Sequence, residues 1–191
     1  MSAKPALAKA RSKAKPASKP KAKPKVKPAK AKAGKAAKAP SPEKTLAGLG
    51  IRLPEVPVPV ANYVPFVRTG KLVFLSGQVP RRADGSFYTG KVGTEVQLQD
   101  AYEHARLVGL QLLAVMRMAA GSLDKVKRVV KLLGMVNGGS GFTDHPKVIN
   151  GCSDLMVEVL GDRGKHARSA VGAGGLPSDC TVEIEAIVEL A

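Results

Sequence analysis

The sequence predicts an α+β domain in which one β-sheet carries two helices on one of its faces. The C-terminal residues alternate strictly between apolar and polar positions, which is typical of a half-buried strand. Elsewhere, apolar residues recur at spacings of three and four, which is typical of a long amphipathic helix. The expected order is strands, long helix, strand, helix and two strands, and the simplest packing of that order is one sheet with two helices on one side.

The charge divides the chain into a basic tail, residues 1–45, and a folded domain, residues 46–191. Residues 1–44 contain 14 Lys, one Arg and one Glu, a net charge of +14, whereas the whole chain carries +16. The remaining residues are therefore almost neutral. Their number is a common size for one compact domain.

The tail consists mostly of Lys, Ala and Pro, like the tails of linker histones. Repeated prolines prevent a continuous helix, and the few apolar side chains cannot offset the entropy lost on ordering, so we expect disorder. Such a chain binds polyanions, including nucleic acids, without sequence preference, because counterions are released from phosphates. The alternative is an appendage that only improves solubility. One Arg and no apolar stripe make a mitochondrial transit peptide a poor description.

The first half of the domain is expected to be a strand hairpin. Pro54, Pro57 and Pro59 make an entering strand irregular or confine it to an edge. Residues 63–67 look extended, residues 68–71 form a Gly-containing turn, and residues 72–76 form a buried strand. A second turn is predicted at residues 83–86.

Two helices and three strands are expected in the second half. Thr94 with Gln97 fits a capping box at the start of the long helix, and Gly121 fits its end. Residues 125–136 are predicted to form a central strand and 146–160 a second helix that ends at Gly161. The last element is expected to be a hairpin of strands 168–173 and 180–190. The helix residues expected to face inward are Leu98, Ala101, Ala105, Val108, Leu112 and Val115 in the first helix and Ile149, Cys152, Met156 and Val159 in the second.

The sheet face without helices is expected to be covered by another subunit. Ile187 lies among the outward positions of the last strand, where a solvated face would be polar. Cys152 and Cys180 fall on apolar faces and are expected to be core residues. Because Cys and His do not cluster, we expect no metal site.

No apolar run approaches the roughly 18 residues that a membrane-spanning helix needs, and no secretory signal follows the start. We therefore expect a cytoplasmic location, with the tail offering a route to association with the nucleoid.

Arg168 and one glutamate of the last predicted strand, whose outer face carries Glu183, Glu185 and Glu189, are the main candidate site residues. The planar guanidinium of an arginine matches a carboxylate, and a nearby glutamate can hold a water molecule, which together indicate a site for a small acid. The alternative is a structural ion pair of Arg168 with Glu183 or Glu185 across the predicted hairpin. His166 neighbours Arg168, but a single flanking histidine is weak evidence for catalysis.

The chain resembles the reactive intermediate deaminase (Rid) family, also called the YjgF-type family and formerly described as L-PSP endoribonucleases. The resemblance covers roughly residues 46–191. It rests on ARSAV, then LP, then VEIEAI near the C-terminus, and on SGQVP, residues 76–80, with Tyr63 thirteen residues before Ser76.

The resemblance implies a chorismate-mutase-like α+β subunit that assembles as a homotrimer with a cleft between each pair of subunits. It also implies hydrolysis of 2-aminoacrylate and related 2-imino acids to 2-keto acids and ammonia, without cofactor. The substrate carboxylate would bind Arg168, and Glu183 would position the attacking water. The other residues implied for the cleft are Tyr63, Ser76, Gly77 and Asn150.

Two features depart from the family pattern. The archetypal cysteine two residues after the arginine is Ala170, and the run GDRGKHARSAVG resembles a divergent bacterial branch. A trimer that binds small acids or nucleic acid without catalysis is therefore the alternative function. An endoribonuclease gains little support, because no His pair is visible.

Overall fold

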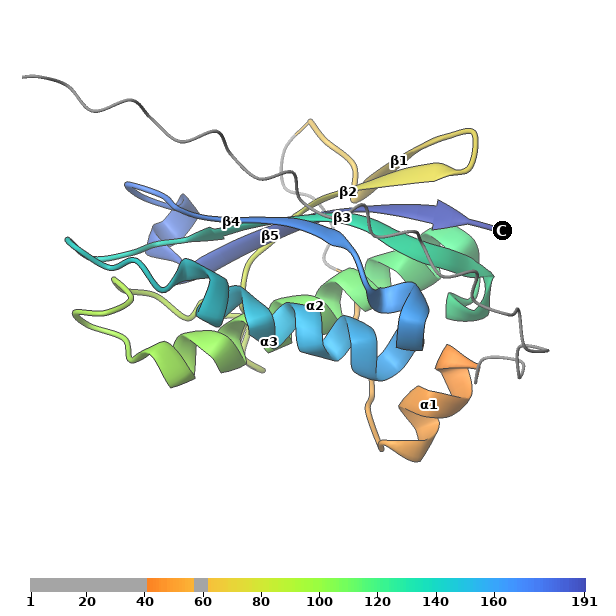
Figure 1. Cartoon of the computed structure of the whole chain (residues 1–191), viewed down its shortest axis with the longest axis horizontal. Helices are drawn as coiled ribbons and strands as arrows, with labels where there is room; N and C mark the ends of the chain where they lie inside the picture. The colour runs from red at the N-terminus through yellow and green to blue at the C-terminus, as the bar shows by residue number, and fades with distance from the viewer. Residues whose placement is uncertain (1–40, 57–61) are drawn as a thin grey trace, which may run out of the picture. The chain divides into compact units, whose positions relative to one another are not determined.

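The computed structural model describes residues 41–56 and 62–191, and shows one five-stranded mixed sheet with two long helices on one face (Figure 1). The strand order is β1-β2-β5-β3-β4. The strands are β1 (Phe66–Thr69), β2 (Leu72–Gln78), β3 (Val126–Val136), β4 (Ala167–Gly172) and β5 (Val182–Leu190), and the α-helices are α1 (Pro42–Gly48), α2 (Leu98–Ala120) and α3 (His145–Leu160). The α+β prediction is confirmed.

Helix α2 buries the predicted apolar stripe but begins later than the sequence indicated. The stripe residues Ala101, Ala105 and Leu112 are fully buried. The predicted capping box is wrong, because Gln97 is the N-cap and makes no side-chain cap bond. The Thr94 hydroxyl donates instead to the Lys91 carbonyl (3.3 Å) in a preceding turn.

The ends of the helices follow the predicted glycines. Gly121 closes α2 with a left-handed φ of 76°, a conformation that side chains with Cβ rarely adopt. In α3 the four residues predicted to face inward are buried, and Gly161 is the C-cap. The helices touch at Gly151, where an added Cβ would lie 1.9 Å from the Tyr102 carbonyl oxygen. Glycine therefore sets how closely α2 and α3 pack.

The first hairpin and the long interior strand are confirmed. Strands β1 and β2 pair antiparallel, with Phe66 opposite Leu75 and Thr69 opposite Leu72. Strand β3 pairs with β5 on one side and β4 on the other. The inward residues of β5 are all buried: Val182, Ile184, Ala186, Val188 and Leu190.

The predicted C-terminal hairpin is wrong. Strand β4 pairs parallel with β3, and β5 pairs antiparallel with β3 on its other side. Residues 173–181 cross the end of β3, where Ala173 N–H donates to the Val136 carbonyl (2.8 Å) and Asn137 N–H to the Thr181 carbonyl (2.9 Å). The backbone at the end of β3 is satisfied by both ends of this loop, which keeps the two strands apart.

Helix α1 crosses the expected boundary at residues 45 and 46. Its N-cap Ser41 donates to Asp124 Oδ1 (2.8 Å), and Glu43 forms an ion pair with Arg117 (2.6 Å). Leu46 is only 2% exposed. The packed part of the chain therefore begins before residue 46, whereas residues 1–40, which include most of the predicted tail, lie outside the described residues.

The core lies between the sheet and the two long helices, and the opposite sheet face carries apolar side chains. Val67 is 58% and Phe74 42% exposed there. Ile187, opposite Phe74 in the neighbouring strand, shares this face. Contiguous exposed apolar side chains are typical of interaction and ligand-binding surfaces. Cover by a second copy stays a prediction.

Candidate functional site

Arg168 projects from edge strand β4 toward α3. Arg168 pairs with Leu132, a buried residue that faces the helices, so the arginine lies on the helix side of the sheet. Its Nη1 donates to Asn150 Oδ1 (2.8 Å) and Ser153 Oγ (3.0 Å), both on α3. Asn150 and Ser153 are three residues apart and therefore share a helix face. Two neutral acceptors orient the guanidinium without neutralising its charge.

Glu183 lies against a β-bulge on the opposite side of the sheet. Leu75 pairs with Ala186 and Gln78 with Ile184, so two residues of β2 stand opposite one of β5. One of the two is Gly77, where an added Cβ would lie 2.2 Å from Glu183 Oε1. Any side chain here would displace the carboxylate, which gives Gly77 a steric role that its sequence motif alone did not reveal.

The surroundings of Glu183 disfavour its charged form. The side chain is half-buried, and loss of hydration raises its pKa above the ordinary value of 4.5; the nearby Glu185 acts in the same direction. A carboxylate whose pKa moves toward neutrality is a stronger base than an exposed one.

Ser76 adjoins Gly77, and its hydrogen bonds hold the segment that contains Tyr63. The Ser76 hydroxyl donates to the Val64 carbonyl (2.6 Å), and Ser76 N–H donates to the Pro65 carbonyl (3.0 Å). These bonds fasten the segment containing Tyr63 to β2. Tyr63 itself is 53% exposed. Its ring is therefore available at the protein surface.

Within one chain, the predicted residues form two separate groups. The arginine group is Arg168 with Asn150, and the acidic group is Glu183 with Gly77, Ser76 and the Tyr63 segment. Strand β3 separates Arg168 from Glu183, and they pair with Leu132 and Met135 respectively. Two strand spacings and three residues along the strand place their Cα atoms about 14 Å apart. Because the two side chains also lie on opposite faces, the proposed ion pair between them is wrong.

Sequence reasoning missed one hydrogen-bond partner of Arg168, Ser153. Ser153 contacts both Arg168 Nη1 and His166 Nε2, at 3.0 and 3.1 Å. The i, i+3 spacing of Asn150 and Ser153 was a usable signal, because both precede the arginine on one amphipathic helix.

Both cysteines are buried, as predicted for core residues. Burial raises the pKa of the Cys152 thiol to about 12, so it stays protonated despite the nearby charge of Arg168. Across residues 41–56 and 62–191, no group of three or more His, Cys, Asp or Glu side chains is placed to hold a metal ion. None of the helices in these ranges combines the length and apolar character needed to cross a membrane.

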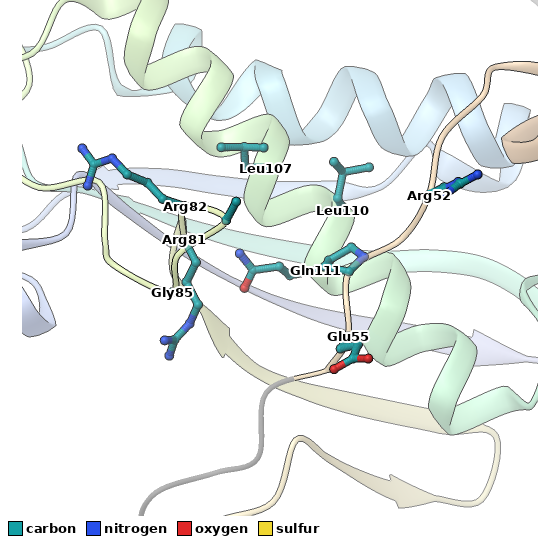
Figure 2. A pocket seen from close by; sticks show the side chains of 10 residues that line it. Arg52, Glu55, Arg81, Arg82, Gly85, Leu107, Leu110 and Gln111 are labelled. Carbon is teal, nitrogen blue, oxygen red and sulfur yellow. The ribbon is translucent and has the colours of Figure 1, made fainter.

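None of the predicted site residues lines a pocket of about 500 Å³ that lies between α2, the loop after β2 and residues 52–55. Figure 2 shows the guanidinium groups of Arg52, Arg81 and Arg82 pointing in different directions. Arg81 stacks on Phe87 and Arg82 on Tyr88, at 4.5 and 4.2 Å from the ring centroids. These arginines do not converge on a common ligand position.

Comparison with known proteins places this fold in a family. Residues 43–190 match the family model described as "YjgF/chorismate_mutase-like, putative endoribonuclease". Protein TCP17 of Trypanosoma cruzi is 43% identical over 143 residues, which cover 74% of this chain and 89% of that protein.

Two further relatives extend the comparison. The 2-iminobutanoate/2-iminopropanoate deaminase of Dermatophagoides farinae is 30% identical over 139 residues, covering 72% of this chain and 93% of that protein. The crystal structure of Atu1372, a protein of unknown function from Agrobacterium tumefaciens, superposes with a TM-score of 0.72 at 42% identity, covering 79% of this chain and 94% of that one. A match over almost the whole described domain, in sequence and in fold, shows that the chain belongs to the YjgF (Rid) family.

Proposed function

We propose that this protein hydrolyses reactive 2-imino acids of the 2-aminoacrylate type to 2-keto acids and ammonia. The observation that carries the proposal is the Arg168 guanidinium, of which one nitrogen, Nη1, is engaged by neighbouring side chains. Its Nη1 is held by Asn150 and Ser153, while Nη2 and Nε make no hydrogen bond within the part of the chain described. These two groups form one edge of the planar guanidinium, which can donate two parallel hydrogen bonds to a carboxylate.

A 2-imino acid carries its carboxylate next to the electrophilic C=N carbon. Two parallel bonds from Arg168 fix the carboxylate and withdraw electron density from that carbon. Water then adds to the carbon, its proton passes to nitrogen, and the resulting tetrahedral carbinolamine expels ammonia to leave the C=O of the keto acid. Holding water and imine together supplies much of the acceleration for so reactive a substrate.

Glu183 is the group we assign to this water. It lies against Gly77, in a half-buried position that raises its pKa and strengthens it as a base. The bulge at Ser76 and Gly77 fixes the position of the carboxylate, and Tyr63 lies on the adjoining segment. We expect the tyrosine ring to form a wall of the substrate cleft.

The separation of the two groups requires a second copy of the chain. Arg168 lies on edge strand β4 and the acidic group lies on the uncovered sheet face, so one subunit's edge can approach the next subunit's face. The apolar side chains of that face, including Val67 and Phe74, would be buried by the same contact. A homotrimer with three composite sites accounts for both features.

The decisive experiment follows keto-acid release from an enzymatically generated 2-imino acid. We expect Arg168→Ala to abolish acceleration and Arg168→Lys to restore only part of it, because lysine lacks the planar fork. Arg106→Ala is the matched control, since Arg106 pairs with Glu158 on the helix surface (2.7 Å). Normal turnover by the Arg168→Ala variant would show that the site is wrongly assigned.

The alternative is a trimer that binds small acids or nucleic acid without catalysis. The observation in its favour is the net charge of +14 in residues 1–44, which suits non-specific contact with phosphates. Filter binding of the full chain and of residues 41–191 over a salt series tests this role. We expect the tail to account for most nucleic-acid affinity and that affinity to fall steeply with salt. We also expect equal imine hydrolysis by both proteins, which would contradict the non-catalytic alternative and leave nucleic-acid binding as an added role of the tail.

A further inference from the structure

We infer that Ser153 and His166 are positioning residues that set the orientation of the Arg168 guanidinium. This inference rests on the proposed function, since it concerns the same arginine. A chain of hydrogen bonds joins the Gly164 carbonyl, the His166 ring, the Ser153 hydroxyl and Arg168 Nη1. Each donor in this chain fixes the direction of the next bond.

The hydrogen-bond chain starts at the Gly164 carbonyl, which can only accept hydrogen bonds. His166 Nδ1 lies 2.6 Å from the Gly164 carbonyl oxygen and therefore carries the hydrogen. In a neutral ring, Nε2 is then the acceptor. The Ser153 hydroxyl, 3.1 Å away, donates to Nε2. Its oxygen is left with lone pairs for Arg168 Nη1, 3.0 Å away.

The position of Gly164 relative to α3 is tightly constrained. Gly164 lies in the short 3-10 helix η2 (Gly161–Gly164), and an added Cβ would lie 2.1 Å from the Met156 carbonyl oxygen. The turn therefore packs directly on the helix that carries Ser153. Backbone contact, rather than a flexible side chain, anchors the far end of the hydrogen-bond chain.

The surroundings of His166 keep the ring neutral. Burial is the main cause that lowers its pKa, and the charge of Arg168 acts in the same direction; the Gly164 carbonyl opposes both. The other charged residues of η2 and its flank are engaged elsewhere. Asp162 pairs with Lys165 (2.7 Å), and Arg163 donates to the Val126 carbonyl (3.1 Å). A neutral ring is the form that accepts from Ser153.

Substitution of Ser153 tests the last hydrogen bond of this series, which Arg168 Nη1 donates to the Ser153 hydroxyl. We expect Ser153→Ala to weaken binding of 2-oxobutanoate, a product keto acid, and to raise KM roughly tenfold, the effect of losing one hydrogen bond to a charged group. The kcat should change little, because the carboxylate is held alike in the ground and transition states. Ser153→Thr keeps the hydroxyl and should retain the wild-type KM and the wild-type affinity for 2-oxobutanoate.

Substitutions at His166 separate positioning from simple support of the turn. The amide of Gln can reach the Nε2 position and accept from Ser153, whereas the amide of Asn lies nearer the Nδ1 position and can only serve Gly164. Positioning predicts that His166→Gln retains a lower KM than His166→Asn, while a role limited to the turn predicts the reverse. In the double variant Ser153→Ala/His166→Asn, KM should not exceed that of Ser153→Ala alone.

All measurements use the full chain, with oligomeric state and Tm recorded for each variant. A wild-type protein that neither turns over imino acids nor binds 2-oxobutanoate would refute the proposed function and this inference together. An active wild type whose Ser153→Ala variant keeps normal KM and affinity would overturn this inference alone. The same holds if His166→Asn binds as well as His166→Gln.

Discussion

The substitution Gly77→Ala tests the acidic half of the site without touching its carboxylate. The added Cβ would stand 2.2 Å from Glu183 Oε1, 3.0 Å from Cδ and 3.2 Å from Cγ. The oxygen must move by about 1 Å to reach ordinary van der Waals contact. Because a displacement of that size can cost about 100-fold when a reacting group must be held in place, we expect kcat to fall by about two orders of magnitude.

Protein stability should respond far less than turnover. Overpacking a closed core costs about 1–3 kcal/mol, but Glu183 is only half-buried and can swing outward. Keto-acid release and thermal unfolding are measured on the same samples. Gly48→Ala is the control, because an added Cβ there meets no atom within 4 Å. Undiminished turnover by Gly77→Ala would refute the placement of Glu183 beside the reacting water.

Three further predictions concern stability and assembly. Glu183→Gln should raise Tm at neutral pH but not near pH 4. The pKa of the Glu183 carboxyl is higher in the folded than in the unfolded chain, so ionisation destabilises the fold as pH rises through that pKa, and the effect is absent where the group is protonated in both states. An equal Tm difference at both pH values would contradict this explanation. Gly151→Ala should lower Tm, because its Cβ would collide with the Tyr102 carbonyl oxygen, which is backbone and cannot turn aside; an unchanged unfolding curve would count against this helix contact. Residues 41–191 alone should form a trimer in light scattering, and a monomer at micromolar concentration would contradict the composite site.

Local periodicity identified most elements because burial imposes it directly. The three-and-four spacing around Ala105 and Leu112 gave α2, and the alternation around Ile184 gave β5. The start of α2 was misplaced because Thr94 and Gln97 satisfy a capping pattern that a preceding turn uses differently. A short motif cannot distinguish these two uses of the same hydroxyl.

The partner strand of β4 and β5 could not be obtained from local sequence, because each of them pairs with β3. Two strands joined by a short loop normally form a hairpin, and only contacts with β3 reveal that it lies between them. Buried Asn137 is central to the crossing, since its side-chain amide donates to Asp179 Oδ1 (2.8 Å) while Lys91 Nζ donates to its Oδ1 (2.5 Å). Family resemblance supplied Arg168 and Glu183 as candidates, but their placement on opposite sheet faces follows from this long-range pairing.

The position of β5 has a consequence for how the protein is made. This strand lies inside the sheet, between β2 and β3, yet it follows every other strand along the chain. A nascent chain therefore displays the unpaired backbone groups along one edge of β2 and one edge of β3 until β5 has been made. The pairing of Phe74 with Ile187 must also close a very large loop. We expect the sheet to close only after β5 has been synthesised, with chaperones shielding these edges in the meantime.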